Sequence, residues 1–133
     1  MTVVVDSAVV VGALVDGGAT GSWAASVLSK HDLVAPHLMP VEVANILRRS
    51  QAAGLITADS ATLAHMDLLD LPVSLVPYLP FAGRAWALRA NLTSYDAWYV
   101  ALAEALGCPL ATLDRRLAGA TGPLCPFLVP SLG

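Results

Sequence analysis

Apolar residues along the chain follow two patterns, which predict alternating strands and helices. Short runs that are apolar at every position are typical of strands buried on both faces of a sheet. The clearest such run, residues 2–5, ends abruptly at Asp6. Apolar residues three or four positions apart predict helices instead. We expect strands at residues 2–5, 33–35, 73–76, 110–112 and 127–129. We expect helices at residues 7–15, from Thr20 onward, from Pro40 to about Ala53, from Thr57 onward, and at residues 81–90, 94–106 and 114–117.

Capping residues set the limits of several of these helices. Thr20, Thr57 and Ser94 are suitable N-caps, because a short hydroxyl side chain can accept a hydrogen bond from a free backbone N–H. Gly54 and Gly107 follow two of the helices and are expected to end them. The helix that begins after Thr57 holds three apolar residues at spacings of three: Leu63, Met66 and Leu69.

The alternation of strands and helices predicts an α/β fold with a central parallel sheet of about five strands, covered by helices on both faces. Such sheets place their sites at the carboxyl ends of the strands. Asp6 ends the first strand, and Asp114 follows the fourth strand by two residues. Glu42 begins the helix after the second strand, and Asp96 begins a helix expected to run antiparallel to the fourth strand. We therefore expect all four acids at one edge of the sheet.

Four carboxylates in one pocket require compensation. Two carboxylates about 6 Å apart repel each other by roughly 3 kcal/mol at an effective dielectric constant near 20, so the group must be protonated or bind a cation. Hard oxygen ligands favour Mg²⁺ or Mn²⁺, which suits the hydrolysis of phosphodiester bonds by an activated water. Ser7 and Thr112 are close enough in sequence to Asp6 and Asp114 to hydrogen-bond these carboxylates.

The same acids also have a structural interpretation. Glu42 and Asp96 fall in first helical turns and Asp114 can cap a helix, and acids are favoured there by the helix dipole. Asp6 is harder to explain in this way, because a carboxylate at the end of a buried strand is costly unless it is hydrogen-bonded or bound to a metal.

Composition limits the class of protein. The 133 residues fit one domain, and with 56% hydrophobic and 13% charged residues we expect a partner subunit to cover some apolar surface. Neither a membrane span nor a signal peptide is indicated, so a cytoplasmic location is expected. The net charge of −3 becomes +1 when the four acids are set aside, which allows an anionic substrate. Cys108 and Cys125 have neither zinc-site nor disulfide-framework spacing.

Three segments resemble a known family: VVVDSAVVVGAL at the start, PVEVANILRR around Glu42, and SYDAWYVALAEALGCPLATLDRRL near the end. They are similar to the PIN domain, in the short form of VapC-type toxins of bacterial toxin–antitoxin pairs. The resemblance covers nearly the whole chain, as one PIN-like nuclease domain at residues 1–133. Its most specific part is the last segment, in which Asp96, the short apolar strand and Asp114 occur in the order and spacing of the family.

The resemblance implies an endoribonuclease that depends on Mg²⁺ or Mn²⁺, with Asp6, Glu42, Asp96 and Asp114 as metal ligands. It also implies a homodimer and a cognate VapB-like antitoxin. Any contact with DNA would be made only through this antitoxin. Some members of the family have a further acid or Asn just after the last of these acids. This chain has Arg115 and Arg116 there, which could contact RNA phosphates instead and leave a second metal position without support.

Two other classes of function are compatible with parts of this pattern. A phosphoacceptor signalling domain also has an acidic pocket at strand ends, but the only lysine, Lys30, lies before the second strand instead of after the last. A PIN-like module with an inactive metal site could act only through its antitoxin. The sequence does not indicate which RNA an active enzyme would cut.

Overall fold

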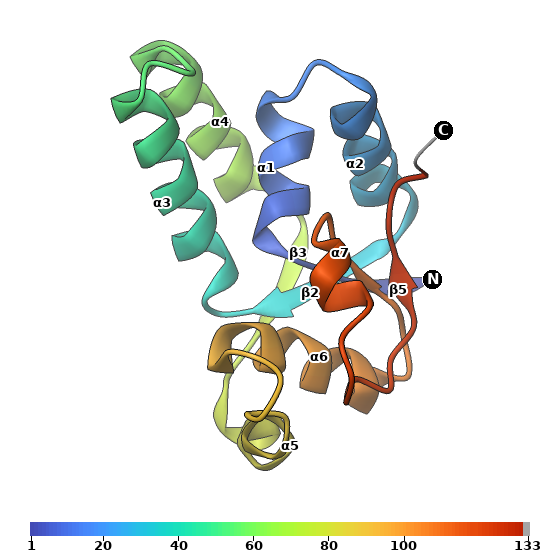
Figure 1. Ribbon diagram of the computed structural model, residues 1–133. Helices are drawn as coiled ribbons and strands as arrows, with labels where there is room; N and C mark the ends of the chain where they lie inside the picture. Colours follow the sequence, from blue (N-terminus) through green and yellow to red (C-terminus); the bar gives the residue numbers. More distant parts are fainter. Residues whose placement is uncertain (132–133) are drawn as a thin grey trace.

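The computed structural model describes residues 1–131, which form a five-stranded parallel sheet between two layers of helices (Figure 1). The strands are β1 (Thr2–Val5), β2 (Asp32–Pro36), β3 (Val73–Val76), β4 (Leu110–Ala111) and β5 (Phe127–Leu128). Their order across the sheet is β3-β2-β1-β4-β5, and all four pairings are parallel. The expected α/β fold with a central parallel sheet is confirmed, and β1 lies at its centre.

The helices are divided between the two faces of the sheet. They are α1 (Ser7–Val15), α2 (Ala19–Lys30), α3 (Met39–Ala52), α4 (Ala58–Asp70), the 3₁₀ helix η1 (Leu79–Phe81), α5 (Ala82–Ala87), α6 (Ser94–Leu106) and α7 (Arg115–Ala118). Helices α1 to α4 pack against one another on one side, whereas α6 lies under β1, β2 and β4 on the other side with η1 and α5 beside it (Figure 1). The sheet is therefore covered on both faces, as expected from the uninterrupted apolar run of β1.

The core is built around β1 and α6. Val3, Val4 and Val5 are fully buried, as expected for an apolar run in a central parallel strand. On α6, the run from Ala97 to Ala103 contains six buried residues, because this helix packs against the sheet with its small side chains. The two strands that flank β1 are held in register by pairs such as Val3 with Leu33 and Val4 with Leu110. The position of Asp6 is therefore fixed by the most buried part of the molecule.

Two of the predicted N-caps are wrong. Thr93, not Ser94, is the N-cap of α6, and its hydroxyl accepts a hydrogen bond from the backbone N–H of Asp96. Helix α2 begins at Ala19 with Gly18 as N-cap, not at Thr20. The preceding turn accounts for this, because Asp16 Oδ1 accepts a 2.7 Å hydrogen bond from the N–H of Gly18. Both differences amount to one or two residues, the usual uncertainty of a helix end.

The apolar spacing in α4 does not mark its buried face. Leu63, Met66 and Leu69 are 61%, 54% and 69% exposed, whereas Ala61, Ala64 and Leu68 face the core. The small alanines allow α4 to pack closely against α1 and α3, which leaves the larger side chains outside.

Several further segments differ from the predicted limits, among them α7, which is shifted by one residue toward the C-terminus. Residues 81–90 do not form one helix, because η1 precedes α5 and α5 ends at Ala87. β2 is longer than expected, whereas β4 and β5 have only two residues each. Thr112 thus lies just beyond β4, where its side chain is free to reach the neighbouring strand end.

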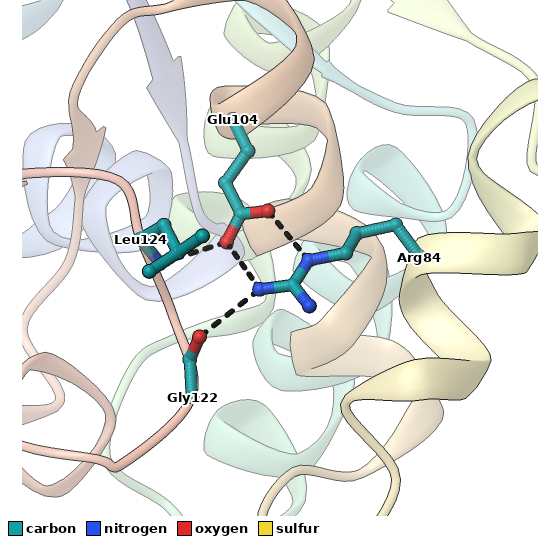
Figure 2. Close-up of polar contacts among 4 residues, drawn as sticks. All are labelled: Arg84, Glu104, Gly122 and Leu124. Carbon is teal, nitrogen blue, oxygen red and sulfur yellow. Dashed lines mark hydrogen bonds and ion pairs between the residues drawn. The ribbon is translucent and has the colours of Figure 1, made fainter.

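Residues 119–126 are tied to the lower helical layer by one polar cluster (Figure 2). Arg84 of α5 donates two hydrogen bonds to the Glu104 carboxylate of α6, at 2.6 and 3.1 Å, and a third to the carbonyl of Gly122 at 3.0 Å. Glu104 also accepts a 2.8 Å hydrogen bond from the N–H of Leu124. This cluster fixes the path of the chain between α7 and β5.

Among residues 1–131, no single helix is long and apolar enough to cross a membrane. Helices α1 and α2 reach the necessary length and apolarity only together, and the chain bends by 112° between them.

Candidate active site

The four acids lie on four different elements near the carboxyl edge of the sheet. Asp6 directly follows β1 and caps α1, and Asp114 follows β4 and caps α7. Glu42 is in the first turn of α3, and Asp96 is in the first turn of α6. Each acid thus has the helix-start position that the structural interpretation required. The positions nevertheless belong to segments that are far apart in sequence, which only the fold brings together.

Asp6 is held by both of its carboxylate oxygens. Oδ1 accepts a 3.0 Å hydrogen bond from the N–H of Val9, and Oδ2 accepts one from the hydroxyl of Thr112. Thr112 is completely buried, and its Oγ1 also accepts a 3.0 Å hydrogen bond from the N–H of Asp114. One buried hydroxyl therefore connects the strand ends that carry Asp6 and Asp114. Thr112 hydrogen-bonds a candidate ligand carboxylate as expected, but this carboxylate is that of Asp6 and not that of the nearer Asp114.

Glu42 is held from the opposite face of the sheet. The hydroxyl of Tyr99 on α6 donates a 2.7 Å hydrogen bond to Glu42 Oε1 on α3. Tyr99 is only 3% exposed. Burial first, and then the hydrogen bond to Glu42, raise the pKa of Tyr99, so its hydroxyl stays protonated and remains a donor. The nearby Ser7 hydroxyl partly opposes this rise in the pKa of Tyr99. Ser7 thus lies near Tyr99, whereas the hydrogen bonds to the Asp6 carboxylate come from Val9 and Thr112 and not from Ser7 as expected.

The electrostatics show that the acids share one environment. Burial raises the pKa of Asp6 from 3.8 to about 6; hydrogen bonds from Thr112 and Val9 oppose the rise, and the charges of Asp96 and Glu42 add to it. Burial, and then the charge of Asp96, raise the pKa of Glu42 despite the Tyr99 hydrogen bond. Burial and the charge of Asp114 likewise raise the pKa of Asp96. Each of the four carboxylates thus interacts with at least one other, which is the condition that a bound cation relieves.

The basic residues beside Asp114 are placed differently from each other. The guanidinium of Arg115 donates a hydrogen bond to the carbonyl of Pro130. The side chain of Arg116 is 96% exposed, and its Nε lies 3.9 Å from Asp114 Oδ1. The N–H groups of Arg116 and Leu117 donate to Asp114 Oδ1 at 2.9 and 3.2 Å. Of the two arginines expected to contact phosphate, Arg116 is therefore the freer.

The donor set fits a hard divalent cation by its chemistry. Carboxylate oxygens are the ligands that Mg²⁺ and Mn²⁺ prefer, and the pKa values of Asp6, Glu42 and Asp96 are raised first by burial and then further by the neighbouring carboxylates. Within residues 1–131, however, no three His, Cys, Asp or Glu side chains are already close enough together to hold a metal ion.

A cavity of about 260 Å³ adjoins two of the acids. Its lining includes Asn91, Thr93, Asp96, Asp114 and Arg116. A larger cavity, of about 440 Å³, lies away from the acids where the end of α1 meets α4, and its lining includes Leu14, Leu55 and Leu63. The acidic edge therefore has an adjacent hollow, and a larger one lies elsewhere on the described chain.

Sequence reasoning did not assign a role to Tyr99, although a usable signal was present. Tyr99 follows Asp96 by three residues, so both side chains lie on the same face of α6. A polar residue at this spacing from a candidate ligand is a candidate partner of that site. The contact with Glu42, which is 57 residues away in sequence, could be found only from the fold.

The fold and this edge define a class: a doubly covered parallel α/β domain with carboxylates at the carboxyl ends of its central strands. Residues 3–122 match the PIN domain family model. The chain is 42% identical to the ribonuclease VapC1 of Mycobacterium tuberculosis over 92% of each chain. It is 37% identical to the ribonuclease VapC9 of the same organism over 96% of this chain and 97% of that one. The chain therefore belongs to the PIN domain family.

A solved structure agrees with this assignment at the level of the fold. The VapBC2 structure from Rickettsia felis, which is bound to a DNA fragment from its promoter, matches with a TM-score of 0.69 and 10% identity. The match covers 97% of this chain and 98% of that chain.

Proposed function

We propose that this protein is a metal-dependent endoribonuclease and the toxin of a toxin–antitoxin pair. Asp6, Glu42, Asp96 and Asp114 would hold Mg²⁺, or Mn²⁺ in its place, which when bound supplies a Lewis acid and an activated water for hydrolysis of an RNA phosphodiester. The observation that carries this proposal is the shared electrostatic environment of the four acids at the carboxyl edge. The ribonuclease relatives described above support RNA as the substrate class.

The residues around the acids have defined tasks in this proposal. Thr112 holds Asp6 in place and accepts from the N–H of Asp114, so the two strand ends keep a constant separation. Arg116 is exposed beside Asp114 and would contact a phosphate of the RNA, with a smaller part for Arg115. The cavity of about 260 Å³ beside Asp96 and Asp114 would receive part of a nucleotide next to the scissile bond.

Cleavage of RNA by purified variants tests the proposal. Total bacterial RNA is incubated with the protein in Mg²⁺, and new RNA ends are sequenced after brief digestion. We expect cleavage by the wild type and a loss of at least about 100-fold in Asp6→Asn and in Asp96→Asn, because removal of one charged ligand weakens the bound ion. Asp32→Asn is the matched control, because Asp32 is exposed at the opposite edge of the sheet, where β2 begins.

Cleavage that persists in excess chelator, or in the two ligand variants, contradicts the proposed mechanism. A protein that binds Mg²⁺ neither in calorimetry nor in a thermal-shift titration supports the alternative of an inactive module. The observation that favours this alternative is the separation of the acids within residues 1–131. A phosphoacceptor role is disfavoured, because Lys30 ends α2 just before β2 and so lies at the amino edge of the sheet.

We further propose that a VapB-like antitoxin binds this chain and that DNA is contacted only through the antitoxin. The relatives and the VapBC2 structure support a partner of this kind. Exposed leucines at 55 and 63 border the cavity of about 440 Å³ between α1 and α4, which gives apolar side chains of an antitoxin a place to bind. This surface is distinct from the acidic edge, so the partner could be held there while another segment reaches the acids.

Co-purification tests the antitoxin site. The chain is co-expressed with the small open reading frame next to its gene, and the recovered complex is measured by light scattering. Leu63→Glu is expected to reduce recovery of the partner at least about 10-fold, because it places a charge in an apolar contact. Leu124→Glu, which changes another exposed leucine, is the control. Equal recovery with both variants contradicts this location of the site.

A homodimer is the remaining part of the proposal. Leu79 on η1 and Trp86 on α5 are both more than half exposed, on elements that pack together below the sheet. Large apolar and aromatic side chains exposed in this way are typical of subunit contacts. Light scattering of the chain purified alone measures this assembly directly.

A further inference from the structure

Tyr99 makes a polar contact that packing alone does not explain. Its hydroxyl lies 2.7 Å from Glu42 Oε1, although the side chain is 3% exposed and belongs to the helical layer on the other face of the sheet. A buried tyrosine hydroxyl needs a hydrogen-bond partner, which a backbone carbonyl could equally have supplied. Here the partner is instead the carboxylate of a candidate metal ligand.

The geometry connects two of the candidate ligands through one helix face. Asp96 and Tyr99 are three residues apart on α6, and Tyr99 in turn contacts Glu42 on α3. Glu42 Oε1 is occupied by the hydroxyl of Tyr99, whereas Oε2 accepts no hydrogen bond from any side chain or backbone group among residues 1–131. A glutamate held by one oxygen presents the other in a restricted range of positions, because its three side-chain torsions are no longer free.

We propose that Tyr99 is a positioning residue that fixes Glu42 for metal binding. This inference rests on the proposed function, because it assumes that Glu42 is a ligand. The phenol donates to Oε1 and leaves Oε2 for the cation. The Glu42 side chain thus loses its conformational freedom when the protein folds, so less entropy is lost when the metal binds. Tyr99 touches neither metal nor RNA in this arrangement and acts through Glu42.

The test compares Tyr99→Phe with Tyr95→Phe. Both variants lose one hydroxyl, but Tyr95 is 60% exposed and only Tyr99 contacts Glu42. Calorimetric titration with Mn²⁺ is expected to show an affinity about 10- to 100-fold weaker for Tyr99→Phe and unchanged for Tyr95→Phe. The Mg²⁺ concentration for half-maximal RNA cleavage should rise by a similar factor, while the rate at saturating Mg²⁺ stays close to that of the wild type. A merely structural hydroxyl would change thermal stability and leave both metal readouts unmoved.

A double-mutant cycle shows whether Tyr99 acts through Glu42. Mn²⁺ affinity is measured for Glu42→Gln and for the double variant. If Tyr99 acts only by placing this carboxylate, the double variant binds Mn²⁺ no more weakly than Glu42→Gln alone. Losses that multiply overturn the inference, because they require an effect of Tyr99 that is independent of Glu42.

A measurement on the unmutated chain covers the case in which Tyr99→Phe does not fold. The wild type is labelled with 3-fluorotyrosine, and its three ¹⁹F signals are assigned with Tyr78→Phe and Tyr95→Phe. We expect the signal of Tyr99 to shift when Mg²⁺ saturates the site and that of Tyr78 to stay in place. A Tyr99 signal that does not respond to Mg²⁺ overturns the inference.

The outcomes separate this inference from the proposed function. A wild type that cleaves RNA with Mg²⁺ but whose Tyr99→Phe variant keeps wild-type metal affinity overturns the role of Tyr99 alone. A wild type that neither binds metal nor cleaves RNA overturns the proposed function, and the role of Tyr99 with it.

Discussion

Asp6 combines two roles that conflict in the absence of a cation. It caps α1 and accepts from Thr112, which stabilises the local structure, yet its charge is partly buried near those of Asp96 and Glu42. Burial and the neighbouring charges outweigh the hydrogen bonds, so the ionised form of Asp6 is disfavoured and its pKa is raised from 3.8 to about 6. The folded protein thus prefers a neutral Asp6 below that pH and bears the cost of its charge above it.

This conflict predicts that Asp6→Asn stabilises the metal-free protein at alkaline pH. Asparagine can accept from Val9 and donate to Thr112 Oγ1, so the cap is kept while the charge is removed. A raised pKa in the folded state means that stability is lost as the pH rises from 3.8 to about 6. The variant avoids this loss, so at pH 8 we expect a gain of roughly 1–3 kcal/mol in the free energy of unfolding. Urea unfolding in chelator measures it.

The gain should shrink as the pH falls to 4, where Asp6 is largely neutral in the folded wild type. Asp32→Asn, at an exposed position, should show no comparable dependence on pH. Added Mg²⁺ should reverse the order of stability, because a ligand that binds only the folded wild type stabilises it. An Asp6→Asn variant that is less stable than the wild type at pH 8 in chelator would contradict the unfavourable charge.

At the scale of elements, the tie between α5, α6 and residues 119–126 is the clearest structural device (Figure 2). Burial alone would raise the pKa of Glu104, but the hydrogen bonds from Arg84 and Leu124 and the charge of Arg84 lower it overall. The carboxylate is therefore stabilised in its ionised form. Because residues 119–126 connect α7 to β5, this tie also limits movement of the segment that follows Asp114.

Arg84→Met is expected to lower the free energy of unfolding by about 1–3 kcal/mol at pH 7, since Glu104 loses its charged partner. Because the pKa of Glu104 is lower in the folded protein than its ordinary value of 4.5, the ionised carboxylate stabilises the fold above pH 4.5. This stabilisation is lost as the pH falls through the pKa that Glu104 has in the folded protein. The difference between variant and wild type should therefore shrink below about pH 4.5. Denaturant unfolding at both pH values measures it, with Arg49→Met on the exposed side of α3 as control. A difference that is constant across this range would contradict the ion pair as its source.

The elements themselves could largely be predicted from the sequence, because local signals determine them. Apolar runs marked β1 and β3, and left-handed Gly107 ends α6 as expected. What local signals could not give was which face of α4 packs. The large side chains of Leu63, Met66 and Leu69 have the helical spacing of a core face, yet the close approach of α1 and α3 selects Ala61 and Ala64. Contacts between distant elements, such as Tyr99 with Glu42, were equally beyond a reading of local patterns.

At the scale of the molecule, the order of the strands determines where the candidate site lies. The chain passes from β1 outward to β2 and β3, then returns to the other side of β1 for β4 and β5. Right-handed crossovers place helices on one face of a sheet for the outward path and on the opposite face for the return. This accounts for α1 to α4 above the sheet and α5 and α6 below it (Figure 1).

The strand order reverses direction between β1 and β4, and open α/β sheets commonly bind their ligands outside the carboxyl ends of the strands at such a point. Asp6 and Asp114 follow those two strands, and the buried Thr112 hydroxyl spans the gap between them. Helix α3 from the upper layer brings Glu42 to this edge, and α6 from the lower layer brings Asp96 and Tyr99. The two helical layers make a polar contact at this edge of the sheet. The hydrogen bond from Tyr99 to Glu42 is that contact, so the residue proposed to position a metal ligand also joins the two helical layers around the site.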